Sequence, residues 1–489
     1  MRKRNLLLAA GASLVTVLLT FGTALADPPS LPPIGPVSLN VQWSTVGLPT
    51  PASVTNGPWT LGQGPATLAH QNKGLCDVFP GGTLQNNTTT HLMQPYYFPE
   101  IKQNPNGTLD GYFDYRIKDT DEAVAHGSST DGGLTWSIDN VKLRLNGTCP
   151  ASDSATNASG NGDNGQGHAF AMTIPALPRP KTLLYTLDRA GNVIDNGGLT
   201  IHDITAGFST LNNIEPVTST TPVPPGVQQT NGLDHPDGIL GVIPGTGTDP
   251  FFNHPKIIYL KKITGSKSSP AAPLDTTKLC TDAQSKPYTS KKANYDYTQL
   301  RIATTTDGIN FTDLGPLSGL NDPNDNASFN GFRFIGPNGT IIRQLDGSYG
   351  VFFSGGGCQD GDSDAYHFIG HAHSPDAVHW TVDNGPTNPL VQVDYTYPTT
   401  SPQVYYTGRV YNPQVIVNPL GSATLIFSGY RTGKPLPDIG TPLGVPPAYT
   451  PAGTDQANYR TIMVQPLQSC LGLTGLPGNP NLFCTPAPH

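Results

Sequence analysis

Short apolar runs, separated by clusters of glycine, proline, asparagine and aspartate, follow one another along most of this chain. Runs of this length bounded by turn residues are typical of β-strands. A proline carried on such a run recurs five times, in Phe98-Pro99-Glu100-Ile101, Ile174-Pro175-Ala176-Leu177, His254-Pro255-Lys256-Ile257, Gly336-Pro337 and Asn412-Pro413-Gln414-Val415. Most of these are followed by a turn and a second apolar run, at residues 111–113, 182–185, 350–354 and 423–428. The pattern predicts five units, roughly residues 91–140, 168–212, 238–315, 328–383 and 405–466.

A tight hairpin is the sharpest local signal. Residues 129–136 read S-x-D-x-G-x-T-W, with Asp131-Gly132-Gly133 at the turn. Glycine can take positive φ there, the Asp131 carboxylate can accept backbone N–H groups, and the Trp136 indole can pack under the hairpin. Residues 304–312 and 373–381 echo this pattern, each with a hydroxyl residue, an aspartate two positions on and an aromatic residue near the exit.

Each unit would be a three- or four-stranded antiparallel sheet, which cannot bury both faces alone. Closing the sheets into a ring solves this problem, so we expect an all-β protein with a β-propeller fold. Five blades are preferred, with residues near 38–75 supplying the strand that closes the ring. Six blades are the alternative if that segment forms a blade with another one, and a β-sandwich is the competing architecture. Long loop insertions are expected at residues 218–229, 266–292 and 433–453.

Composition agrees with this architecture. The 489 residues include 55 glycines and 49 prolines, and only 13% are charged. The only glutamates are Glu100, Glu122 and Glu215, so nearly all the acids are aspartates, which favour turns and caps. The net charge of −8 argues against nucleic acid as the main partner.

The N-terminus has the pattern of a secretory signal peptide. A basic start is followed by the apolar run from Leu6 to Leu19 and by an Ala24-Leu25-Ala26 cleavage site. We therefore expect a secreted, extracellular protein cleaved after Ala26, with no membrane span in the mature chain. The expected organisation is a signal peptide (1–26), a Pro-rich lead-in (27–37), a propeller domain (38–466) and a C-terminal tail (467–489). Six cysteines in an exported chain suggest three disulfides, and Cys470–Cys484 is the most local pair.

From Tyr96 to Trp136 the chain resembles the first blade of the Asp-box, or BNR-repeat, sialidases. The matching pieces are an aromatic strand ending in proline, a glycine turn, an Asp-x-Arg strand, an acidic loop and the hairpin, at residues 96–99, 106–108, 114–116, 119–122 and 129–136. The resemblance implies a propeller. It also places Tyr97 where the family has one of three arginines that clamp the substrate carboxylate. The family's Tyr–Glu catalytic pair lacks a glutamate here beyond Glu215.

The five units and the Ser-Pro-Asp-x-x-His-Trp-Thr hairpin at 374–381 are also similar to arabinanase, xylosidase and fructosidase propellers. Those enzymes use an aspartate base just before the first-blade proline, an orienting aspartate and a glutamate acid, because cleaving a glycosidic bond takes two carboxyls. Here the base position holds Phe98, and its equivalents hold His254 and Asn412. Glu100 lies two positions later on the same side of the strand.

These patterns predict a carbohydrate-active propeller, with glycoside hydrolysis at the central funnel favoured over a non-catalytic module that binds a glycan or polysaccharide. The candidate catalytic residues are Glu100, Asp121, Asp234 and Asp237. The candidate substrate-binding residues are Tyr97, Arg116, His235, His254, Arg333, Arg409 and Asn412. No cofactor is required, and a structural calcium ion could be shared by Asp360, Asp362 and Asp364, whose carboxylates alternate along the chain.

Overall fold

The computed structural model describes residues 38–56, 95–118, 121–144, 166–175, 179–188, 199–207, 228–243, 254–262, 298–320, 334–344, 346–356, 368–383, 388–392, 409–418, 422–430, 460–474 and 483–484. All regular secondary structure in these ranges is β-strand. They contain no helix of the length and apolarity needed to cross a membrane.

The strands form five sheets. Blade one is β4 (Pro95–Gln103), β5 (Leu109–Lys118), β6 (Asp121–Ser129) and β7 (Thr135–Arg144), with β3 (Ser53–Asn56) outside β7. Blade two is β8 (Gln166–Ile174), β9 (Lys181–Asp188), β10 (Thr200–Asp203) and β11 (Gln228–Gln229). Blade three is β12 (Pro236–Ile243), β13 (Lys256–Lys262), β14 (Thr298–Thr305) and β15 (Phe311–Pro316). Blade four is β16 (Phe334–Ile335), β17 (Thr340–Arg343), β18 (Tyr349–Gly356), β19 (Phe368–Ser374), β20 (Thr381–Val382) and β21 (Val391–Gln392). Blade five is β22 (Arg409–Val417), β23 (Ser422–Tyr430) and β24 (Arg460–Thr474), with β1 (Ser38–Thr45), β2 (Thr50–Pro51) and β25 (Phe483–Cys484) paired to β24.

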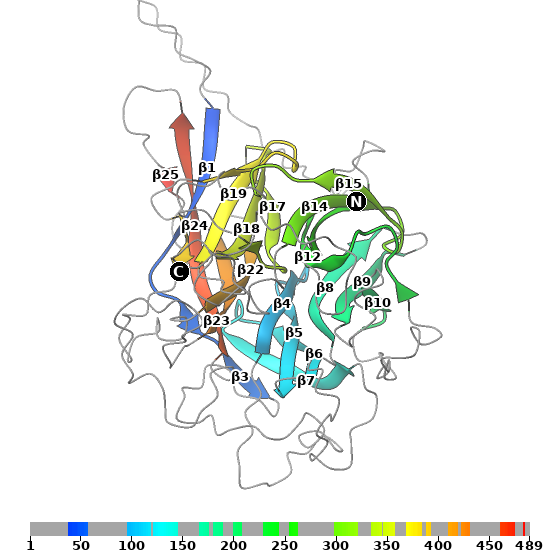
Figure 1. Ribbon diagram of the computed structural model, residues 1–489. Helices are drawn as coiled ribbons and strands as arrows, with labels where there is room; N and C mark the ends of the chain where they lie inside the picture. Colours follow the sequence, from blue (N-terminus) through cyan, green and yellow to red (C-terminus); the bar gives the residue numbers. More distant parts are fainter. Residues whose placement is uncertain are drawn as a thin grey trace, which may run out of the picture.

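The five sheets surround a common centre (Figure 1), which confirms the five-bladed propeller. One strand of each blade lies innermost, and these strands contact one another in the order β4, β8, β12, β17, β22 and back to β4. The N-terminal strand β1 pairs along its whole length with the C-terminal strand β24. The segment expected to close the ring therefore does so. Of its other described strands, β2 also pairs with β24 and β3 joins blade one, so neither forms a sixth blade.

Apolar side chains fill the spaces between neighbouring blades. Blades three and four share a cluster that includes Leu240, Val351 and Phe353, each fully buried. Blades four and five share another, in which the Trp43 and Phe352 rings meet edge to face at 5.6 Å. Each buried side chain of this size contributes about 1.5–3 kcal/mol. Both faces of a blade are thus buried only because the ring supplies a neighbour on each side.

The three predicted hairpins form the expected turn. Asp131 Oδ1 accepts the Thr135 N–H at 2.8 Å, and the Trp136 indole N–H donates to Gly133 O at 2.8 Å. In the second hairpin, Asp307 Oδ1 accepts two backbone N–H groups at 2.8 Å, although its sequence matches the pattern less well. The third hairpin repeats this arrangement with Asp376. In each of these blades the innermost strand ends beside the hairpin turn, and we call this side of the ring the hairpin face.

Two expectations are wrong, one for a proline motif and one for a loop. His254-Pro255 lies just before β13, which is the second strand of blade three and not its innermost strand, whereas Ile174-Pro175 lies at the end of the innermost strand β8. Proline lacks an N–H and is tolerated at strand ends as well as in irregular strands, so it does not identify which strand it belongs to. Gln228 and Gln229, expected in a loop, pair with β10 as β11.

One expected cysteine pair is brought together. The register of β24 and β25 sets Cys470 opposite Cys484, the juxtaposition that a local disulfide between them requires. The full set of three disulfides stays a prediction.

Candidate functional site

The innermost strands turn their unpaired edges toward the centre of the ring. An edge strand presents free N–H and C=O groups, which must find partners or water. In four blades the pairing of the innermost strand with the second strand is interrupted, between Tyr97 and Glu100, Gly167 and Phe170, Pro236 and Ile239, and Tyr411 and Gln414. In blade four, residues 336–339 divide β16 from β17 at the same place.

These interruptions behave as β-bulges, which bend a strand and redirect its side chains. Pro99, Pro337 and Pro413 lie within them, because a proline there removes no ladder hydrogen bond. In blade three, Pro236 is the last paired residue before the interruption and lies opposite Lys261. Blade three therefore has a proline at the edge of its bulge, whereas His254-Pro255 lies outside the innermost strand.

Two amide side chains link the bulges across the channel, and we call them the amide layer: Asn338 and Gln414. Gln414 Oε1 accepts the Ile101 N–H of blade one at 3.2 Å, and its Nε2 donates to Asn338 O at 2.9 Å. Asn338 donates from Nδ2 to Ala169 O of blade two at 2.6 Å and from its backbone N–H to Ile239 O of blade three at 2.8 Å. The amide layer thus satisfies edge groups of all five innermost strands.

Three non-glycine residues in or directly before the innermost strands have positive φ, namely His235 at 45°, Asn338 at 57° and Asn412 at 49°. Asparagine tolerates this left-handed region better than most residues. Asn412 is 1% exposed, yet neither its Oδ1 nor its Nδ2 has a hydrogen-bond partner within the described residues. Asn338 and Asn412 therefore share a positive φ but differ in what their side chains bind.

A cavity of about 880 Å³ occupies the channel and extends toward the hairpin face. All five innermost strands contribute to its wall, which includes Glu100, Lys102, Phe170, Met172, Thr340 and Gln414. His254 and Thr306 lie at its hairpin-face end. Glu100 is the sole carboxylate among the lining residues of this cavity. Two predicted site residues, Glu100 and His254, are thus brought together, whereas Asn412 is not in its wall.

Burial governs the protonation of the acidic and basic side chains in this cavity. It raises the pKa of Glu100 to about 8, although nearby Lys102 partly opposes the shift. Burial also lowers the pKa of the Lys102 amine. Glu100 is therefore mainly a protonated, hydrogen-bond-donating carboxylic acid at neutral pH.

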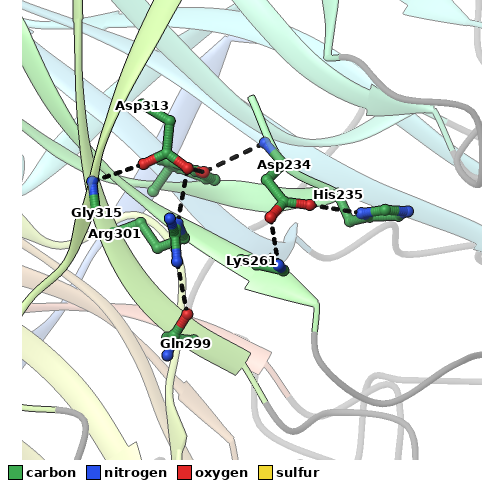
Figure 2. Close-up of polar contacts among 8 residues, drawn as sticks. Asp234, His235, Lys261, Gln299, Arg301, Asp313 and Gly315 are labelled. Atoms are coloured by element: carbon green, nitrogen blue, oxygen red, sulfur yellow. Dashed lines mark hydrogen bonds and ion pairs between the residues drawn. The ribbon is translucent and has the colours of Figure 1, made fainter. Parts of the chain in front are cut away.

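A second polar site lies where β12 begins, at the end of the blade away from the hairpin (Figure 2). Asp234 Oδ1 lies 2.7 Å from His235 Nδ1, and its Oδ2 accepts a hydrogen bond from Lys261 Nζ. Burial alone would raise the pKa of Asp234, but the hydrogen bonds from Lys261 and His235 outweigh it and lower the pKa. Asp234 and His235, both predicted from the sequence, therefore form a pair anchored by a lysine.

Behind this pair, Tyr259 joins it to an ion pair. The Tyr259 hydroxyl accepts the Asp234 backbone N–H at 3.2 Å and donates to Asp313 Oδ2 at 3.0 Å. Arg301 Nε donates to the same carboxylate oxygen at 2.8 Å. Figure 2 shows Asp313 and Arg301 on the side of Asp234 away from His235. Asp237, the remaining catalytic candidate of this blade, is half-buried on β12.

The other candidates are placed only in part. Tyr97, Arg116, Asp121 and Arg409 lie on described strands, but their side chains lie outside the description. Arg333 and the three aspartates of the expected calcium site, Asp360, Asp362 and Asp364, lie outside the described residues. Within the described ranges no group of three or more His, Cys, Asp or Glu residues could hold a metal ion. The arginine clamp and the calcium site thus stay predictions.

Several residues of these sites were not predicted, among them Lys102, Lys261, Asn338 and Gln414. Gln414 and Asn338 each adjoin a proline of the repeat, so a search for polar residues after such prolines could have found them. Lys261 carries no signal of this kind, because its partner Asp234 is 27 residues away.

Comparison with known proteins gives similarities to solved structures alone. No protein-family model matches the chain, and no curated protein does. An N-acetylgalactosamine deacetylase from F. plautii, in complex with blood group B trisaccharide, is 11% identical with a TM-score of 0.44, covering 86% of this chain and 95% of its own. A thermostable family-43 glycoside hydrolase is 12% identical with a TM-score of 0.39, covering 81% and 97%. The α-L-arabinofuranosidase from Podospora anserina, in complex with cellotriose, is 10% identical with a TM-score of 0.38, covering 76% and 95%.

Proposed function

We propose that this protein is a carbohydrate-active β-propeller that holds a neutral sugar in the channel cavity. The observation that carries the proposal is the chemistry of the cavity wall. Ligand pockets typically enclose about 300–1,000 Å³ and combine apolar surface with a few fixed polar groups. Here a protonated Glu100, the Thr340 hydroxyl and the Gln414 amide offer uncharged hydrogen-bonding groups beside Phe170. Sugar hydroxyls and the apolar face of a sugar ring match such a surface.

Glycoside hydrolysis is a second candidate, favoured by the raised pKa of Glu100. A general acid must be protonated at the working pH, and burial provides this for Glu100. The usual mechanism also needs a second carboxyl about 5–10 Å away. Among the residues that line the described cavity there is none, so this candidate requires an acid from outside it. Sugar binding requires no such residue.

Secretion and a relation to the sialidase-type propellers belong to the same proposal. The basic, apolar and A-x-A segments of residues 1–26 support export. The first-blade pattern from Tyr96 to Trp136 supports the relation. A secreted propeller with a sugar-sized central cavity would meet polysaccharides outside the cell.

Calorimetric titration with neutral and acidic mono- and oligosaccharides tests the proposal. We expect neutral sugars to bind, and binding to weaken as the pH rises through about 8 because Glu100 becomes ionised. Glu100→Gln keeps a neutral side chain and removes this pH dependence, whereas Glu100→Ala weakens binding. Asp203→Asn, an exposed change on blade two, is the control.

Chromogenic arabinosides, xylosides, fructosides and sialosides test the hydrolytic candidate in parallel. Loss of turnover in Glu100→Gln with retained sugar binding would support a general acid. If no neutral sugar binds to the wild-type protein, or if Glu100→Ala binds as tightly as the wild type, the channel cavity is not the sugar site.

A further inference from the structure

The Asp234–His235 pair has the geometry of a proton-transfer centre. Because Asp234 Oδ1 lies 2.7 Å from His235 Nδ1, the imidazole donates its Nδ1 proton to the carboxylate and leaves Nε2 as an acceptor. The histidine side chain is 35% exposed, so Nε2 can be reached from solvent. The pair therefore presents one oriented proton acceptor at the start of β12.

Two neighbouring side chains, those of Lys261 and Tyr259, hold the pair in place. Lys261 Nζ donates to the second oxygen of the Asp234 carboxylate, and the Asp234 N–H donates to the Tyr259 hydroxyl. These contacts fix the carboxylate and keep it ionised, so it orients the imidazole and does not itself exchange protons. Lys261 in turn comes from β13, the adjacent strand of the same sheet.

His235 is also held in an unfavourable backbone conformation. Its φ of 45° lies in the left-handed region, which a histidine adopts rarely. Conformations of this kind persist where the surrounding structure enforces them, and they occur often at functional sites. Here the conformation sets His235 directly before Pro236, the first residue of the innermost strand of blade three.

We propose that His235 is the general base for hydrolysis of an acyl ester, with Asp234 as its positioning residue. In the first step, Nε2 takes a proton from a water molecule while the water oxygen bonds to the ester carbonyl carbon, and the C=O π electrons move onto the carbonyl oxygen. In the second step, this oxyanion re-forms the C=O bond, the C–O bond to the alcohol breaks, and the imidazolium returns the proton to the departing oxygen. The products are a carboxylic acid and an alcohol, and His235 is regenerated.

The presence of one available proton-transfer group favours an ester over a glycoside. In acyl hydrolysis a single imidazole serves first as base and then as acid, because attack and departure occur at the same carbonyl carbon. Displacement at a sugar's anomeric carbon needs an acid and a base on opposite sides of the bond. At this site Asp234 is held by Lys261, and Asp313 is held by Arg301 and Tyr259. His235 is thus the one residue of the group in Figure 2 with a free proton-accepting atom.

The structure offers a matched control for the experiment. His379 Nδ1 also lies 2.7 Å from an aspartate oxygen, that of Asp376, but in an exposed hairpin turn where its side chain is 70% exposed. The probes are 4-nitrophenyl acetate and glucose pentaacetate, with release of nitrophenolate or acetate measured on the full chain. We expect His235→Gln to lower kcat about 100-fold or more, and His379→Gln to leave it unchanged.

Two further measurements separate proton transfer from a structural role. The wild-type rate should rise with pH, and His235→Gln should abolish this rise while its thermal unfolding midpoint stays within the range of the control variant. Asp234→Asn should lower kcat with KM unchanged. Absence of wild-type hydrolysis, or equal rates in His235→Gln and His379→Gln, would overturn the proposal. Sugar binding at Glu100 is measured separately, so either proposal can fail without the other.

Discussion

Replacing Asn338 by glycine removes the side-chain link between blades two and four. Asn338 is fully buried, and its Nδ2 lies 2.6 Å from Ala169 O, which is also buried. Glycine adopts the φ of 57° without strain, so the backbone should be unaffected. The loss comprises a hydrogen bond of about 0.5–1.5 kcal/mol and an unpartnered buried carbonyl costing about 1–3 kcal/mol. Asn338 Oδ1 has no partner within the described residues, so its removal offsets about 1 kcal/mol of this loss. We expect a net destabilisation of roughly 1–3 kcal/mol.

Asn412→Gly is the matched comparison. Asn412 also has positive φ and is 1% exposed, but neither polar atom of its side chain has a partner within the described residues. Removing an unpartnered amide relieves its desolvation cost of about 1–3 kcal/mol. The added freedom of glycine in the unfolded chain offsets about 0.4–1 kcal/mol of that gain. The net change should therefore be near zero or slightly stabilising.

Thermal unfolding followed by tryptophan fluorescence measures both variants, because Trp43, Trp136 and Trp380 are buried in three different blades. An unfolding entropy of about 2.1 cal/mol/K per residue gives about 1 kcal/mol/K for a chain of this length. Asn338→Gly should thus lower Tm by roughly 1–3 °C, whereas Asn412→Gly should leave Tm unchanged or raise it slightly. Equal shifts in the two variants, or a larger shift for Asn412→Gly, would refute the role assigned to the amide layer.

Two further predictions concern blades three and four. His373 and buried Asp383 form an ion pair at 2.5 Å, and the hydrogen bond to Asp383 raises the pKa of His373. Burial alone would raise the pKa of Asp383, but His371 and His373 outweigh it and lower the pKa. The contribution of His373 to folding stability is complete below the pKa of an unfolded histidine and is lost as the pH rises through the higher pKa of the folded state. The contribution of Asp383 to folding stability is lost only in acid. Urea unfolding should therefore show stability falling more steeply between about pH 6 and 8 in the wild type than in His373→Gln, which keeps the fall caused by the raised pKa of Glu100; parallel curves would contradict this. Gly232→Ala should destabilise by about 3 kcal/mol or more, because the new Cβ would lie 2.0 Å from Phe311 O at a φ of 83°. Gly47→Ala, at a φ of 69° with no atom within 4 Å, should cost only about 1 kcal/mol, and similar Tm values for the two would show that the close contact relaxes.

Local features were predictable because their physical causes lie within a few residues. The hairpin at 129–136 forms from hydrogen bonds between residues at most four apart, including Ser129, Asp131 and Thr135. The second apolar runs of the units became β5, β9, β18 and β23 because they combine β-propensity with flanking turns. Glu100 was predicted because it lies two positions beyond the expected base position and on the same side of the strand, and the structure buries it in the channel.

The assignment of prolines to strands failed for a general reason. Proline at 255 and proline at 236 both lie beside apolar runs, but one precedes a second strand and the other begins an innermost strand. A missing N–H is compatible with both positions. Only the pairing partner distinguishes them, and pairing is a property of two segments.

The sequence by itself thus determined the strands, the hairpin turns, the number of units and the N-terminal strand that closes the ring, because these follow from short-range periodicity and turn chemistry. The tertiary structure alone decided which side chains meet at the centre. Ile101 binds Gln414, 313 residues away, and Asn338 binds Ala169, 169 residues away. These contacts arise because ring closure turns five unpaired strand edges toward one another, and unsatisfied backbone groups there select amide partners wherever the chain supplies them.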